Sequence, residues 1–101
     1  MTMDCGDALM ENSLVKLQTL LESVGETFWR NKVSASLGDQ VDIDGVLSWY
    51  GGMGSINDLV IAAVNGHHLG TRSEWVLNKE LNQLRDEVFS IAKEQRRIAG
   101  G

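Results

Sequence analysis

The last quarter of the chain carries the most regular hydrophobic pattern in the sequence, and it limits the possible folds more than any other stretch. Its apolar residues recur at alternating spacings of four and three, which is the period of an amphipathic helix. The seam residues are Leu77, Leu81, Leu84, Val88, Ile91, Gln95 and Ile98. The spacing predicts one helix over residues 74–98, about 37 Å long at 1.5 Å per residue, which needs neighbours along most of one face.

Two further features of this segment bear on its start and its packing. Thr71-Arg72-Ser73-Glu74 has the Thr-x-x-Glu form of a capping box, which predicts Thr71 as the cap of the helix. Trp75 and Phe89 lie outside the seam and widen the apolar surface, so we expect contacts with more than one neighbour. The same surface predicts a homodimer through the C-terminal helix.

A second seam with the same period occurs near the start of the chain and predicts another helix, which Gly25 ends. Its residues are Met10, Leu14, Leu17, Leu21 and Val24. A shorter helix is predicted over residues 26–37, with Trp29 and Phe28 as core anchors. A short helical segment is predicted over residues 46–50. Because the first and last seams match in period, we expect those two helices to pack antiparallel.

The segment between Ile56 and Val64 is open to two interpretations. Its apolar residues keep to one helical face, which favours a helix that Asn65-Gly66 closes. The run from Leu59 is also rich in β-branched residues, and Asn-Gly is a strong hairpin signal. The fold predicted is therefore mainly α, a small helical bundle with a long C-terminal helix, and the alternative is α+β with a short hairpin around residues 58–70.

Composition bounds the class of protein. At 101 residues without a linker, the chain predicts a single domain over residues 1–101. A formal net charge of -5 argues against a nucleic-acid partner. One cysteine, no signal-peptide pattern and no long apolar run lead us to expect a cytoplasmic protein that does not insert in a membrane.

Two clusters of potential metal ligands do not complete a site. The acidic run from Asp39 to Gly45 resembles a calcium loop, but it has Gln40 at the first ligand position and Gly51 at the twelfth. Asp39 or Asp42 is better explained as a helix cap. Adjacent His67 and His68 predict a solvated loop pair, because neighbours on a regular element point in different directions. We predict no metal and no cofactor.

The stretch from Trp49 to Leu59 contains three glycines within four residues and is the candidate binding site. A glycine turn before a helix start can present backbone N–H groups to a phosphate or carboxylate, and the aromatic pair could stack on a ring. The candidate residues are Trp49, Tyr50, Gly51, Gly52, Gly54, Ser55, Asn57 and Asp58. The turn lacks the lysine of a nucleotide P-loop, and Ser55 is not in a nucleophile elbow, so we expect no enzyme.

A structural role explains the same residues. The glycines allow a tight turn, Met53 fills the core, and Ser55 with Asp58 caps the next element. The run Trp49-Tyr50-Gly51-Gly52-Met53-Gly54-Ser55 with Asn57-Asp58-Leu59, followed by Asn65-Gly66-His67, resembles the signature of a family of small bacterial proteins that has no established activity. This resemblance implies a bacterial source and transfers no catalytic or binding residue.

The functional prediction from the sequence is therefore a small acidic bacterial interaction module, of the kind that immunity and antitoxin proteins represent. It would act by contact with a protein partner. The alternative is a small-molecule or anion-binding protein that uses the glycine turn at residues 51–55.

Overall fold

The computed structural model describes residues 5–38, 40–51 and 54–100. The helices are α1 (Cys5–Ser23), α2 (Thr27–Ser36), α3 (Ile43–Ser48) and α4 (Glu74–Gly100), with two 3-10 helices, η1 (Ile56–Asp58) and η2 (Ala63–Asn65). Within these ranges no strand forms, and only an isolated bridge joins Leu37 to Val41. The predicted mainly α bundle with a long C-terminal helix is confirmed.

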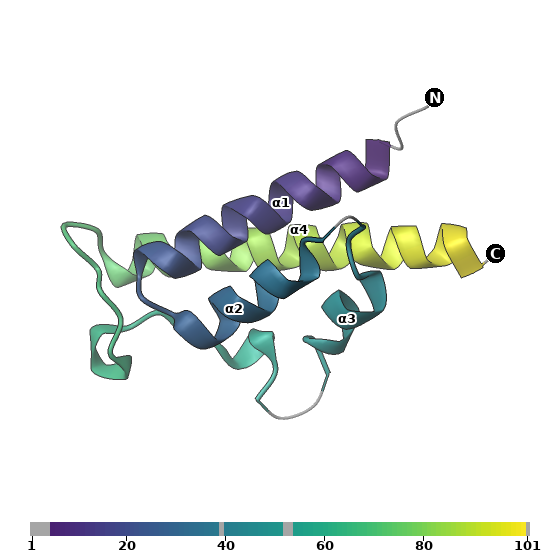
Figure 1. The fold of residues 1–101 in the computed structure, drawn as a ribbon. Helices are drawn as coiled ribbons and strands as arrows, with labels where there is room; N and C mark the ends of the chain where they lie inside the picture. Colours follow the sequence, from purple (N-terminus) through teal and green to yellow (C-terminus); the bar gives the residue numbers. More distant parts are fainter. Residues whose placement is uncertain (1–4, 39, 52–53, 101) are drawn as a thin grey trace.

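Helices α1 and α4 lie side by side and run in opposite directions, as their matching seams predict (Figure 1). Helix α2 packs against α1, and α3 packs against α4. The two 3-10 helices lie in the long connection that returns the chain from α3 to the start of α4 (Figure 1). No helix of the described ranges is long and apolar enough to cross a membrane.

One hydrophobic core joins the four α-helices and the connection. Both predicted seams contribute to it, since their central residues are buried, whereas Ile98 at the end of α4 is exposed. The buried core residues are Met10, Leu14, Leu17, Leu20, Leu21, Val24, Trp29, Val33, Val46, Trp49, Ile56, Ile61, Leu77, Leu81, Leu84, Val88 and Ala92. The core therefore forms where the apolar seams of neighbouring helices interdigitate.

The caps of α2 and α3 come from acidic side chains. A Glu26 carboxylate oxygen accepts a hydrogen bond from the backbone N–H of Trp29, and Asp42 accepts one from Gly45. Asp42 is one of the two predicted cap residues. Trp29 is buried as predicted, but the prediction for Phe28 was wrong: its side chain is 62% exposed, because it occupies the outer face of the first turn of α2.

The predicted cap of α4 was wrong by two residues. The Ser73 hydroxyl, and not that of Thr71, accepts a hydrogen bond from the backbone N–H of Val76. Glu74, which the capping box would turn back onto its own helix, instead accepts a hydrogen bond from the backbone N–H of Ala63. The Glu74 side chain therefore connects the start of α4 to Ala63, whereas a capping box would have kept it within its own helix.

The helix predicted over residues 56–64 does not form, and neither does the alternative hairpin around residues 58–70. The chain makes one 3-10 turn at Ile56–Asp58, continues without regular secondary structure through residues 59–62 with extended backbone at Leu59 and Ala62, and makes a second 3-10 turn at Ala63–Asn65. We call residues 56–63 the strap. Gly66 ends the second turn in the left-handed region, with φ of 88°, so Asn65-Gly66 is a turn but not the loop of a hairpin.

Candidate functional site

The strap is held to α4 mainly by side chains of that helix. The Arg85 guanidinium donates to the backbone carbonyls of Ile56 and Leu59, at 2.8 and 3.0 Å. About two helical turns earlier, Asn78 binds both backbone groups of Ile61: its Oδ1 accepts from the N–H at 2.7 Å, and its Nδ2 donates to the carbonyl at 2.8 Å. These bonds replace the ladder that a neighbouring strand would supply.

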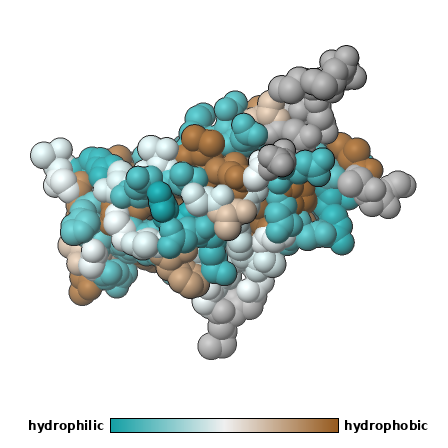
Figure 2. All heavy atoms as spheres, viewed as in Figure 1, coloured by the Kyte–Doolittle hydropathy of each residue, from teal (hydrophilic) through white to brown (hydrophobic). Residues whose placement is uncertain are grey.

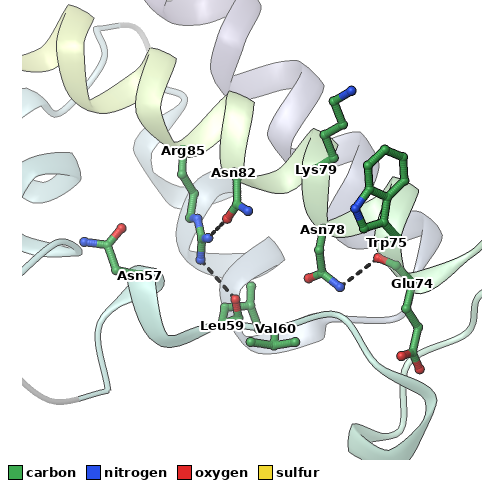
Figure 3. A pocket seen from close by; sticks show the side chains of 9 residues that line it. All are labelled: Asn57, Leu59, Val60, Glu74, Trp75, Asn78, Lys79, Asn82 and Arg85. Carbon is green, nitrogen blue, oxygen red and sulfur yellow. Dashed lines mark hydrogen bonds between the residues drawn. The ribbon is translucent and has the colours of Figure 1, made fainter.

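A groove of about 700 Å³ lies between the strap and α4 (Figure 3). Asn82 and Arg85 point from α4 towards Leu59 and Val60, while Asn57 lies at the opposite end from Trp75. The lining residues are Asn57, Leu59, Val60, Glu74, Trp75, Asn78, Lys79, Asn82 and Arg85. The groove thus combines an apolar wall with side-chain amides and two cationic groups.

Trp75 is the most unusual side chain of the groove. It is 71% exposed on the first turn of α4, and the Lys79 ammonium lies 5.1 Å from the centre of its ring. Val60, in the strap, is 53% exposed, and Val64, in the turn that follows, is 92% exposed. We call Val60, Val64, Trp75 and Lys79 the Trp75 surface.

The space-filling view shows how hydrophobic residues are distributed on one face of the molecule (Figure 2). On that face they gather along the middle of α1, near the far end of α4, and at the corner that η2 occupies. Hydrophilic residues separate these groups. The η2 corner belongs to the same end of the molecule as the start of α4 (Figure 1), so the exposed valine and tryptophan side chains come from segments that meet there.

The aromatic pair of the glycine stretch does not face the groove. Trp49 is buried and meets Trp29 edge to face, with ring centres 6.3 Å apart. The ring of Tyr50 lies against Phe89, 4.7 Å between centres, and its hydroxyl donates to the backbone carbonyl of Arg85 at 2.8 Å. Both side chains therefore join α3 to the rest of the core.

The environment of Tyr50 predicts an alkaline titration. Burial raises the pKa of its phenol above the ordinary value; the nearby Asp86 charge raises it further and Arg85 partly opposes this. A folded-state pKa above the unfolded one contributes stability that is present below about pH 10 and is lost as the pH rises beyond it. Tyr50 is the only tyrosine, so we expect native protein to show little tyrosinate absorbance just above pH 10.

The same titration in denaturant is the reference, since unfolded chain should ionise with a midpoint near pH 10. A Tyr50→Phe variant should lose the absorbance change altogether. A native midpoint near pH 10 would contradict the buried, hydrogen-bonded phenol.

The polar residues of the glycine stretch mostly bind one another. The Ser55 hydroxyl accepts from the backbone N–H of Asn57, and an Asp58 carboxylate oxygen accepts from that of Gly54. The N–H of Ile56 donates to the Trp49 carbonyl at 2.8 Å. Three backbone donors are thus occupied, and the Asp58 carboxylate would repel an anion.

The glycines of that stretch have no side chain that could contact a ligand. Gly54 has φ of 74°, in the left-handed region where glycine is favoured, and Gly51 lies in open space. Gly52 and Met53 lie outside the described residues, so the predicted role of Met53 in the core is not addressed. The segment after the turn is a single 3-10 turn, which lacks the dipole of a full helix.

The stretch from Trp49 to Leu59 and the groove share two residues, Asn57 and Leu59, and of these only Asn57 was a candidate binding residue. Sequence reasoning missed the rest of the groove, because Asn78 and Arg85 lie on the polar side of the C-terminal helix, where solvated residues are expected. The one available signal was Trp75, a large aromatic residue outside the seam of its own helix.

The prediction of a solvated histidine pair was wrong for His67. Its ring is buried: Nδ1 accepts from the backbone N–H of Ala62 at 3.0 Å, and Nε2 lies 2.8 Å from a Glu26 carboxylate oxygen. Because Nδ1 accepts, the proton is on Nε2 and is donated to Glu26. His68 is exposed as predicted. Among the described residues no group of three or more His, Cys, Asp or Glu side chains could hold a metal ion.

Residues 22–70 match the family model of a domain of unknown function (DUF6966). The match begins near the end of α1 and stops before α4, so it includes the glycine stretch and the strap. No curated protein and no solved structure matches the chain.

Proposed function

We propose that this protein is a small interaction module that acts by binding another protein, and that it binds through the Trp75 surface. The observation that carries the proposal is the Trp75 side chain, 71% exposed at a groove of about 700 Å³. Tryptophan is strongly enriched among the residues that dominate binding energy at interfaces. Neutralising a partner by contact, as immunity and antitoxin proteins do, would need no catalytic group on this chain.

The geometry supports this role better than the alternative at residues 51–55. A protein partner could cover Val60, Val64 and Trp75 together, and Lys79 would supply a cation at the edge of the apolar area. At the glycine turn, by contrast, an anion would compete with the Asp58 carboxylate for the Gly54 N–H. The bacterial origin, the cytoplasmic location and the homodimer through the C-terminal helix stay predictions from the sequence.

Site-specific crosslinking tests the proposal. We expect a photoreactive phenylalanine analogue in place of Trp75 to form a defined adduct with one protein in cells of the source organism. Gln83, exposed on the same helix but outside the groove lining, is the matched control position and should not form that adduct. Adducts of equal yield from both positions would contradict the proposal.

The partner identified in this way allows a quantitative measurement. A Trp75→Ala variant should bind it at least about 30-fold more weakly, since a hot-spot side chain contributes about 2 kcal/mol or more. Its midpoint of thermal unfolding should stay close to that of the wild type, because the side chain is largely exposed. Unchanged affinity would show that Trp75 is not the anchor.

A further inference from the structure

We infer that the groove takes a segment of the partner protein in an extended conformation and holds its backbone through the side-chain amide of Asn82. This inference rests on the proposed function and specifies the kind of segment that binds there. It follows from three features of the groove. These are the way α4 already binds the strap, the polar side-chain groups that are free to bind a ligand, and the positions of the apolar side chains.

The chain itself shows that this face of α4 binds extended backbone. The strap passes along α4 with extended backbone at Leu59 and Ala62, and Asn78 makes a two-point contact with the N–H and carbonyl of Ile61, at 2.7 and 2.8 Å. A side-chain amide is suited to this because it carries a donor and an acceptor, as a peptide group does. The contact depends on backbone and not on the identity of the side chain that is bound.

Asn82 carries the same amide one turn further along α4. It lines the groove and points towards the strap (Figure 3). Its Oδ1 accepts from Arg85, whereas hydrogen bonds within the described ranges leave its Nδ2 free to donate. A backbone carbonyl of a second extended segment, lying beside the strap, is the matching acceptor.

The remaining groups specify the side chains of that segment. In an extended chain, successive side chains point to opposite sides, so one apolar side chain can enter between Val60 and Trp75 while its neighbours face away. The Glu74 carboxylate is already engaged with Ala63, and Lys79 remains as an exposed cation beside Trp75. The matching segment carries an acidic residue close to its apolar anchor.

Two other occupants fit less well. A partner helix would need a stripe of apolar residues on the outer face of α4, but beyond Trp75 that face continues with Asn82, Asp86 and Ser90, all exposed and polar. A second copy of this chain would bring together two molecules that each carry a net charge of -5. We therefore commit to an extended segment of a different protein.

Selection from a phage-displayed library of random linear peptides tests the inference on the intact chain. Peptides retained by the wild type and not by a Trp75→Ala variant are synthesised, and their affinities are measured by calorimetry. We expect an apolar anchor with a neighbouring Asp or Glu. An Asn82→Asp variant removes the Nδ2 donor at nearly constant size and adds a negative charge that repels the acidic residue of the peptide, so it should bind at least about tenfold more weakly.

Gln83→Ala is the matched control and should bind these peptides as the wild type does. In spectra of isotopically labelled protein, the side-chain amide signals of Asn82 should shift on peptide addition, and the bound peptide should have the carbon chemical shifts of extended backbone. Helical bound peptides, unchanged affinity of Asn82→Asp, or a library that yields no Trp75-dependent peptide would each overturn the inference. The crosslinking result at Trp75 would stand in those cases, so a failure here is distinct from a failure of the proposed function.

Discussion

Replacing His67 with alanine is expected to lower the free energy of unfolding by about 3 kcal/mol. The change removes the acceptor of the buried Ala62 N–H and the donor to Glu26, and an unsatisfied buried polar group costs about 1–3 kcal/mol. It also leaves a cavity where the ring is now buried. In a domain of this size such a loss lowers the midpoint of thermal unfolding by about 12–24 °C.

The neighbouring histidine provides the control for this measurement. His68→Ala should cost less than about 1 kcal/mol because the side chain is exposed. His67→Gln can place an amide oxygen and an amide N–H near the two partners, so it should recover part of the loss. Equal effects of the two alanine variants would show that the Glu26 and Ala62 contacts do not stabilise the fold.

Replacing Asn78 with alanine is expected to cost about 2–3 kcal/mol and to loosen the strap. Ile61 is fully buried, and its backbone N–H and carbonyl both bind the Asn78 amide, so the variant leaves a donor and an acceptor without partners. Hydrogen exchange gives the most direct readout. The Ile61 amide should exchange at least tenfold faster in the variant, while core amides of α1 change only with global stability.

Two other variants separate the contributions to this effect. Asn78→Asp keeps the acceptor for the Ile61 N–H and loses the donor to its carbonyl, so it should fall between wild type and alanine. Asn82→Ala, one turn away and without a bond to the strap backbone, should leave Ile61 exchange nearly unchanged. Fast exchange at Ile61 in the wild type would contradict the structure of the strap.

The parts of the fold that the sequence predicted depend on periodicity within one segment. The seams of α1 and α4 repeat over many turns, and burying two matching seams together is favourable for any loop arrangement. The cap at Asp42 is equally local, because donor and acceptor lie three residues apart. The antiparallel pair of long helices therefore followed from pattern alone.

The strap could not be predicted in this way, because its contacts connect residues far apart in the sequence. The run from Ile56 to Val64 has a helical pattern, but Arg85 and Asn78 bind its backbone groups from α4. These contacts make an extended path favourable and override local propensity. His67 was misjudged for the same reason, since its partner Glu26 is 41 residues away.

In the candidate site, too, the features that the sequence could not predict are contacts between distant segments. The glycine stretch drew attention as a binding loop, yet Trp49 and Tyr50 pack inward and Ser55 and Asp58 satisfy backbone groups of their own turn. Trp75 was noted only as an apolar residue outside the seam. The groove beside it exists because the strap runs alongside α4, and no pattern in either segment alone indicates that contact.

The contacts that anchor the strap show that the family match and the folded domain have different boundaries in this chain. The segment that matches DUF6966 ends at residue 70, but the side chains that hold its strap, Glu74, Asn78 and Arg85, come after that point. More than half of the buried hydrophobic side chains also lie before residue 22 or after residue 70. The unit that sequence comparison detects is therefore smaller than the unit that folds, and a minimal expression fragment should retain both α1 and α4.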